Sequence, residues 1–454
     1  MHTAGRAKGD AMNTAVGSDR ARGALLGLAV GDALGAPAEN LRPSEIRRRW
    51  GRIEGFVSDD PAGTDDTEYA IFSGLLLARH GSALDVSHVE RAWHHWIADL
   101  DEGPFRGAGF SERGTLENLR RGLAAPISAQ HRHAWSDGLA MRAAPFGVFA
   151  AGRPAEAARL VAVDGRVSHE GEGIYGGQAV AAGVAAAMVG SGLASVIAAA
   201  LSVVPMDSWT ARSLRRAVTA AQRPYPDRLT MERAVRSAVV IAGYPWTDLA
   251  PEAVGLAFGA FTAARGDFRT AVLTAVNMGR DADTTAAVAG ALAGALNGEC
   301  AIPPDWAGAI GPVRGSCLPS MRGYHVLDIA ELLTPEDPDG TGPAGSPQVR
   351  GGGEPSGVRD MASVAAPFEP VRDMASVAAS SEPVRDMASV AARSVPVRDM
   401  KSAAASSAPA QSMASTAAPF EPVQGMTSVA TSSAPTQILT SATAPSVPVR
   451  EDRR

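Results

Sequence analysis

Small residues recur at every fourth position in two distant stretches of the chain. The two series are Gly23, Gly27, Gly31 and Gly35, and Ala286, Gly290, Gly294 and Gly298. Positions four apart share one face of an α-helix, and glycine on that face lets a second backbone approach closely. We therefore expect two buried helices that pack on each other and bring the residues after Gly35 toward those before Ala286. Period-two alternation is scarce throughout, so the sequence predicts an all-α fold.

Composition changes abruptly after Leu333. We expect a polar, disordered N-terminus over residues 1–18, one folded domain over 19–335, and a low-complexity tail over 336–454. The tail repeats every 13 residues, as its methionines show: Met361, Met374, Met387, Met400, Met413 and Met426. A period this short, with prolines and few large apolar residues, cannot easily build a stacked core, so we expect a disordered tail. An array of partner-binding segments is the alternative.

Charge and cysteine content exclude several protein classes. The formal net charge of -6 provides no basic field for nucleic acid. Two cysteines, Cys300 and Cys317, cannot form a disulfide framework, which favours a reducing cytoplasm. The uncharged run 173–206 is divided by a glycine pair into halves shorter than the ~20 residues of a membrane span. We expect two buried helices there, and a monomeric cytoplasmic protein without membrane attachment.

Acidic residues and threonines crowd the start of the second small-residue helix. Asp281, Asp283 and Thr284 lie where a loop becomes that helix. One cap needs one such residue, and crowded carboxylates repel each other unless a cation or proton neutralises them. From these residues alone, a Mg²⁺ or Mn²⁺ site and an elaborate cap are equally good interpretations.

Two further acidic stretches lie upstream. Thr64, Asp65 and Asp66 precede another apolar helical run, and the GDALGAPAE stretch ends at Glu39. The simpler interpretation of the latter is a turn with a solvated glutamate. Three acidic junctions in one chain are hard to explain as three caps.

These three stretches, in this order, resemble the ADP-ribosylglycohydrolases over about residues 20–333. The resemblance implies a single orthogonal bundle of α-helices with two divalent cations, Mg²⁺ or Mn²⁺, in a cleft. It implies that Thr64, Asp65 and Asp66 hold one cation, that Asp281 and Thr284 hold the other, and that Asp283 bridges them. Glu39 is expected to be the general acid or base, or a further ligand. The implied catalytic residues are Glu39, Asp66 and Asp283.

The implied reaction is hydrolysis of the glycosidic bond between ADP-ribose and a protein side chain or small molecule. Two alternatives are a non-catalytic ADP-ribose-binding module and a metal-dependent hydrolase of another nucleotide-like substrate.

Several polar stretches are candidates for binding the substrate. Glycine-rich backbone with hydroxyls can line a diphosphate, although an irregular loop is the simpler interpretation. The residues that the resemblance assigns to the substrate are Gly107, Gly109, Ser111, Ser136, Gly138, Met141 and His169. Asp137 stands where the family usually has asparagine; because it lies outside the acidic junctions, we expect it to affect substrate rather than metal binding. Arg280, where the family often has glycine, is expected to contact a phosphate or anchor a carboxylate.

Overall fold

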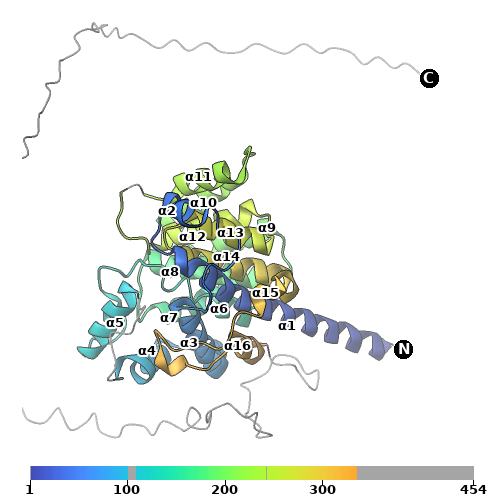
Figure 1. Ribbon diagram of the computed structural model, residues 1–454. Helices are drawn as coiled ribbons and strands as arrows, with labels where there is room; N and C mark the ends of the chain where they lie inside the picture. Colours follow the sequence, from blue (N-terminus) through green and yellow to red (C-terminus); the bar gives the residue numbers. More distant parts are fainter. Residues whose placement is uncertain (1, 101–108, 242, 335–454) are drawn as a thin grey trace, which may run out of the picture. The chain divides into compact units, whose positions relative to one another are not determined.

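The computed structural model describes residues 2–100, 109–241 and 243–334. These residues form helices joined by loops (Figure 1). Within these ranges no strand is formed, and an isolated antiparallel bridge joins Ser136 to Leu249. The predicted all-α fold is confirmed. The repeat tail predicted for 336–454 lies outside the described residues.

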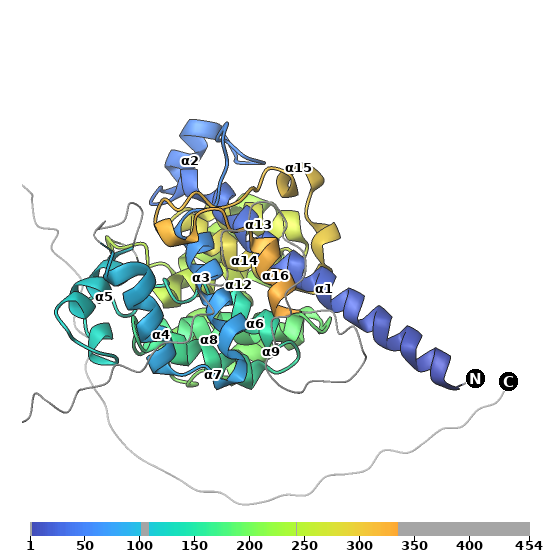
Figure 2. The same cartoon turned by 90° about the horizontal axis from the view of Figure 1, so that it is seen from below.

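The helices differ widely in length. In chain order they are α1 (His2–Gly35), α2 (Pro43–Trp50), α3 (Asp65–His80), α4 (Val86–Trp93), α5 (Phe110–Arg120), α6 (Ala144–Phe149), α7 (Pro154–Gly165), α8 (Glu172–Ala187), α9 (Leu193–Ser202), α10 (Trp209–Ala221), α11 (Arg228–Val239), α12 (Ala250–Ala263), α13 (Phe268–Met278), α14 (Ala282–Asn297), α15 (Pro304–Ala307) and α16 (Val326–Leu333). Helix α14 lies near the centre of the views in Figures 1 and 2 and contacts α1, α8, α12 and α13. All its residues from Ala282 to Ala295 are buried.

Helices α1 and α14 pack antiparallel along their small-residue faces. A Cβ on Gly23 would lie 2.5 Å from the Gly294 carbonyl oxygen, and one on Gly27 would lie 2.5 Å from that of Gly290. Such separations exclude any side chain, so the glycines are required by the close approach of two backbones. The predicted pairing is confirmed. It places the C-terminal end of α1 beside the N-terminal end of α14.

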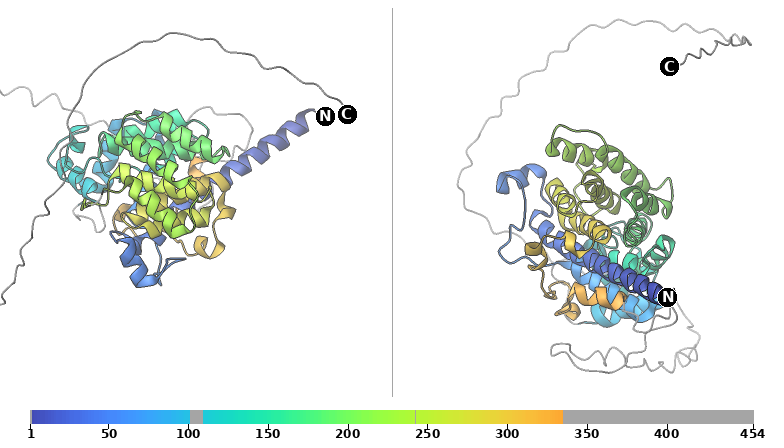
Figure 3. Two further views of the ribbon diagram at one scale, coloured as in Figure 1. Left: turned by 90° about the horizontal axis from the view of Figure 1, so that it is seen from above. Right: turned by 90° about the vertical axis from the view of Figure 1, so that its right-hand side faces the viewer.

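The N-terminal segment differs from the expectation of disorder. Helix α1 begins at His2, so most of the segment 1–18 is helical, and its first turns extend beyond the neighbouring helices (Figures 1 and 3). The physical reason is that adding residues to an existing helix requires no new nucleus. The buried part of α1 supplies that nucleus, and residues 2–18 contain no proline.

The uncharged run 173–206 forms α8 and α9, as predicted. Helix α8 is buried along most of its length, whereas α9 buries Val196, Ile197 and Ala200 and leaves other residues at the surface. Within the described ranges, no helix combines the length and the apolarity needed to cross a membrane. Tight packing of small residues inside the protein therefore explains α8, whereas the expectation of a second buried helix holds only for one face of α9.

Candidate active site

A cavity of about 360 Å³ opens where the segment after α1, with Glu39 and Asn40, meets the N-terminal ends of α3 and α14. Its walls also come from the start of α5, the segment 136–141 and the loop 245–248. The predicted site residues that line it are Glu39, Thr64, Asp65, Asp66, Gly109, Ser111, Ser136, Gly138, Met141, Asp281, Asp283 and Thr284. Segments separated by more than two hundred residues in sequence thus contribute to one cleft.

Asp32 organises the start of α3. Its carboxylate is fully buried and accepts hydrogen bonds from the backbone N–H of Thr64 (2.7 Å) and of Thr67 (3.2 Å). It also accepts from the hydroxyls of both threonines, at 2.7 Å from Thr64 and 2.5 Å from Thr67. A residue of α1 therefore satisfies two of the N–H groups that the start of α3 leaves unpaired. Because Asp32 supplies these acceptors, Asp65 and Asp66 are free to face the cleft.

Neither acidic junction is used as a helix cap. The N-cap residues Thr64 of α3 and Asp281 of α14 make no side-chain cap hydrogen bond. Asp66 Oδ2 and Asp283 Oδ1 are buried without any hydrogen-bond partner. Buried carboxylate oxygens normally have partners, because leaving them unpaired costs free energy. The elaborate-cap interpretation therefore does not account for these residues.

The charges in the cleft repel one another. Burial raises the pKa of Asp66 well above its usual value, and the neighbouring carboxylates of Asp32 and Asp283 add to the effect. The pKa of Asp283 is likewise raised well above normal by burial first, and then by Asp281 and Glu39. Positive charge bound in the cleft would oppose these effects and favour the ionised carboxylates.

The donor set fits hard divalent cations. Carboxylate and hydroxyl oxygens are the ligands that Mg²⁺ prefers, usually one or two carboxylates completed by water. Thr284 donates a hydrogen bond to Asp66 Oδ1 (3.2 Å), so the two junctions touch across the cleft. Among the described residues, no group of three or more His, Cys, Asp or Glu side chains is arranged to hold an ion on its own. Threonine oxygens, water or substrate would therefore complete the coordination.

Glu39 lies at the solvent-exposed edge of the cleft. Its Oε1 accepts a hydrogen bond from Asn40 Nδ2 (2.8 Å). Partial desolvation against the protein raises the pKa of Glu39, and the charge of Asp248 adds to this, whereas the bond from Asn40 opposes it. A carboxyl group with a raised pKa and access to water is suited to proton transfer.

Asp137 joins the acidic cluster. Its side chain is 4% exposed, and Oδ2 has no hydrogen-bond partner. Its charge is, after burial, the largest contribution to the raised pKa of Asp281. Asp137 is far from the acidic junctions along the chain, but the fold places it in the same cleft as Asp66, Asp281 and Asp283. The premise that Asp137 lies apart from the acidic junctions is therefore wrong, and its effect on substrate rather than cation binding stays a prediction.

Five of the seven predicted substrate residues line the cleft. Gly109, Ser111, Ser136, Gly138 and Met141 line the cleft, as noted above, whereas Gly107 lies outside the described residues. His169 does not line the cleft.

His169 is 1% exposed and lies behind Ser136, with Nε2 3.1 Å from Ser136 Oγ. Burial first, and then Arg142, hold the pKa of His169 well below its usual value, so the imidazole is neutral. In this conformation it supports Ser136 and supplies no positive charge for a phosphate.

A buried polar network extends behind the cleft. Ser136 Oγ donates to Ser111 Oγ (2.7 Å), which donates to Glu112 Oε2 (2.7 Å). Arg142, fully buried, pairs with Asp164 at 2.8 Å and lies 3.7 Å from Glu112 Oε1. The network fixes the two serine hydroxyls, because each has a defined partner.

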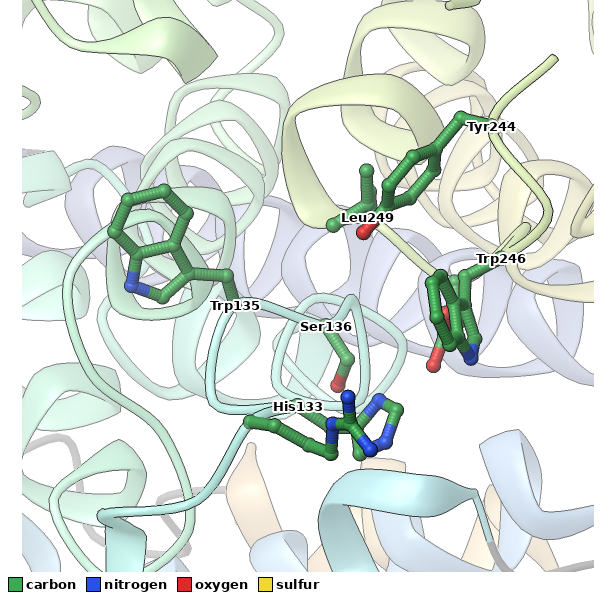
Figure 4. Close-up of a pocket in the computed structure, with 8 residues that line it drawn as sticks. His133, Trp135, Ser136, Tyr244, Trp246 and Leu249 are labelled. Atoms are coloured by element: carbon green, nitrogen blue, oxygen red, sulfur yellow. The ribbon is translucent and has the colours of Figure 1, made fainter.

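A second cavity, of about 210 Å³, adjoins the first and shares Ser136, Trp246 and Asp248 with it. Aromatic rings surround it, with Trp135 and Trp246 on opposite sides of Ser136 (Figure 4). Tyr244 completes one wall, and its ring centroid lies 5.5 Å from that of Trp246. These two rings pack against each other in a tilted arrangement, and an aromatic face of this kind can stack on an aromatic group of a ligand.

Sequence reasoning missed several residues of the site. Asp32 lies in the GDALGAPAE stretch that ends at Glu39. A carboxylate on a helix expected to be buried could have indicated that Asp32 supports the site. Glu112 follows the predicted Ser111 directly. Trp246 and Asp248 lie in a loop without any pattern, and only the fold brings them to the cleft.

Fold and cavity define an all-α protein with an acidic cleft at the N-terminal ends of two buried helices. Residues 13–338 match the family model described as ADP-ribosylglycohydrolase. The chain therefore belongs to the ADP-ribosylglycohydrolase family, and the resemblance given by the three acidic stretches is confirmed.

This chain is similar to individual proteins over most of the length of each of them. An uncharacterized protein of Archaeoglobus fulgidus is 30% identical over 298 residues, covering 63% of this chain and 90% of the relative. The ADP-ribosyl-(dinitrogen reductase) glycohydrolase of Rhodospirillum rubrum is 28% identical, covering 63% and 89%. The ADP-ribosylarginine hydrolase Tri1 of Pseudomonas putida is 29% identical, covering 63% and 73%.

Proposed function

We propose that this protein is a hydrolase that removes ADP-ribose from a protein side chain or a small molecule, and that it uses two divalent cations, Mg²⁺ or Mn²⁺. The observation that carries the proposal is the convergence of two uncapped acidic junctions on one cleft, with unpaired buried oxygens on Asp66 and Asp283. Family membership supports the activity, and the names of two relatives support an ADP-ribosylated protein as substrate.

The charge of the cleft supports a need for cations. Eight carboxylates line it: Glu39, Asp65, Asp66, Glu112, Asp137, Asp248, Asp281 and Asp283. Arg113 is the one arginine or lysine among its described lining residues. The diphosphate of ADP-ribose would be repelled from such a cleft unless bound cations offset this charge.

Thr64, Asp65, Asp66, Asp281, Asp283 and Thr284 are the residues that would hold the cations. When bound, divalent cations neutralise carboxylates, bind sugar hydroxyls and lower the pKa of water.

The chain's own residues would perform the remaining steps. Glu39 would transfer a proton between water and the leaving group. Ser111 and Ser136, held by the buried network, would hydrogen-bond the substrate, and the aromatic cavity would accept its base by stacking.

A substrate panel tests the proposal. Chelator-treated protein is incubated with ADP-ribosylated arginine, ADP-ribosylated serine and O-acetyl-ADP-ribose, with and without Mg²⁺ or Mn²⁺, and released ADP-ribose is measured. We expect cation-dependent release from at least one substrate. Saturable binding of ADP-ribose without release from any of them would instead identify a binding module. Neither release nor binding would point to a hydrolase of another substrate class.

A further inference from the structure

Arg280 adopts a backbone conformation that normally favours glycine. It lies in the turn between α13 and α14, immediately before Asp281, with φ of 71°. Residues with a side chain adopt positive φ at a cost that glycine avoids. We therefore ask which contacts of the Arg280 side chain offset the cost of this backbone conformation.

Arg280 is not among the residues that line the cleft, and its guanidinium group binds the loop beside it. It forms an ion pair with Glu252 of α12, whose side chain is 1% exposed. Its Nη1 donates to the Tyr244 carbonyl at 3.1 Å, and its Nη2 donates to the Trp246 carbonyl at 2.7 Å. The planar fork of a guanidinium can hold a carboxylate and two carbonyls at once, which an ammonium group cannot do with the same geometry.

The bound loop forms a wall shared by both cavities. Trp246 and Asp248 line the acidic cleft and the aromatic cavity alike. The far end of this loop is fixed by the backbone bond from Asp137 N to the Asp248 carbonyl (2.9 Å). Its middle is held by Arg280.

The backbone of Arg280 holds a third segment. Asn40 N donates to the Arg280 carbonyl (2.7 Å), and Arg280 N donates to the Leu41 carbonyl (3.1 Å). Asn40 in turn bonds Glu39 and accepts from the hydroxyl of Thr247. Arg280 thus connects the Glu39 segment, the acidic turn and the aromatic loop.

We propose that Arg280 is a positioning residue that fixes the wall Tyr244–Asp248 relative to the acidic cluster and thereby sets the affinity for substrate. The identity of that substrate rests on the proposed function. A loosened wall weakens ground-state and transition-state binding alike, so KM should change more than kcat.

Two substitutions and one matched control test the proposal. Arg280→Gly removes the guanidinium and suits the positive φ, but leaves Glu252 buried without its partner. Arg280→Lys retains a positive charge for Glu252 and loses the fork, so it provides the test even if the glycine variant fails to fold. Arg265→Gly is the control, because Arg265 also has positive φ (53°), is exposed and lies at the end of α12 outside both cavities.

The first measurement needs no substrate. Chymotrypsin cleavage after Trp246 is followed by mass spectrometry, with cleavage after Leu123, which is exposed and lines neither cavity, as internal reference. We expect both Arg280 variants to be cleaved faster after Trp246, and Arg265→Gly to match wild type. Unchanged cleavage in both Arg280 variants would overturn the proposal, whether or not the protein hydrolyses ADP-ribose conjugates.

The second measurement uses whichever conjugate the protein hydrolyses. We expect the Arg280 variants to raise KM by about tenfold, while kcat changes by less than about twofold. A fall in kcat at unchanged KM would assign Arg280 to the catalytic turn instead and would also overturn the proposal. If no conjugate is hydrolysed, the proposed function fails, and the cleavage experiment alone decides the role of Arg280.

Discussion

Replacing Asp283 should distinguish a cation site from a helix cap. Its side chain is 5% exposed, Oδ1 has no partner, and the charges of Asp281 and Glu39 help to raise its pKa. In the cation-free protein this carboxylate is destabilising, because it is buried among like charges. In the cation-loaded protein it would be a ligand. The two states should therefore respond oppositely to Asp283→Ala.

The expected change in melting temperature follows from the linkage between cation binding and folding. A cation that binds the folded state alone stabilises it by about 2.7 kcal/mol at a hundredfold excess over its Kd. The described part has roughly 320 residues, for which the unfolding entropy is about 0.7 kcal/mol per kelvin. Wild type should therefore melt about 4 °C higher after Mg²⁺ or Mn²⁺ is added. Asp283→Ala should lose most of that rise and all turnover, and its cation-free form should melt no lower than cation-free wild type.

Differential scanning calorimetry of chelator-treated protein, with and without added cation, measures both quantities. Asp267→Ala is the matched control, because Asp267 caps α13 by accepting from Thr270 N (2.9 Å). It should lose roughly 0.5–2 kcal/mol in both states and keep the cation effect. If Asp283→Ala behaved like this control, the cation-site hypothesis would be refuted.

Four further outcomes are expected. Burial raises the pKa of Asp32 to about 6, and that of Asp66 is raised well above its usual value, so the folded protein binds more protons than the unfolded chain. The stability of the cation-free protein should therefore fall as pH rises above about 4, by up to ~1.4 kcal/mol per pH unit for each extra proton, as urea denaturation would show. Asp32→Ala should cost about 1.5–3 kcal/mol and abolish the cation-induced rise in melting temperature, because the start of α3 loses its acceptors. Glu39→Gln should lower kcat by about 10²–10⁴-fold in the substrate panel while the cation-induced rise persists; loss of that rise would make Glu39 a ligand instead. A chain ending at Thr334 should retain full turnover, and its loss in a folded truncation would assign the tail to the site.

The helices that carry the site could be predicted from short-range sequence patterns. The four-residue spacing of glycines predicted both buried helices and their pairing, since period and residue size act over a few turns of helix. That pairing placed Glu39 near Asp281 and Asp283, as the structure now shows. The expectation of disorder for residues 1–18 rested on their polar composition instead, and there the continuation of a helix outweighs weak local preference.

The tertiary structure alone decided how the site is supported. Nothing in the sequence indicates that Asp32 satisfies the start of α3, or that His169 lies behind Ser136 rather than in the cleft. The loop carrying Trp246 has no periodicity, and its position depends on the hydrogen bonds from Arg280. These contacts join segments that are up to about 35 residues apart along the chain. Which side chains meet over such separations is set by how whole helices pack, and no local pattern encodes it.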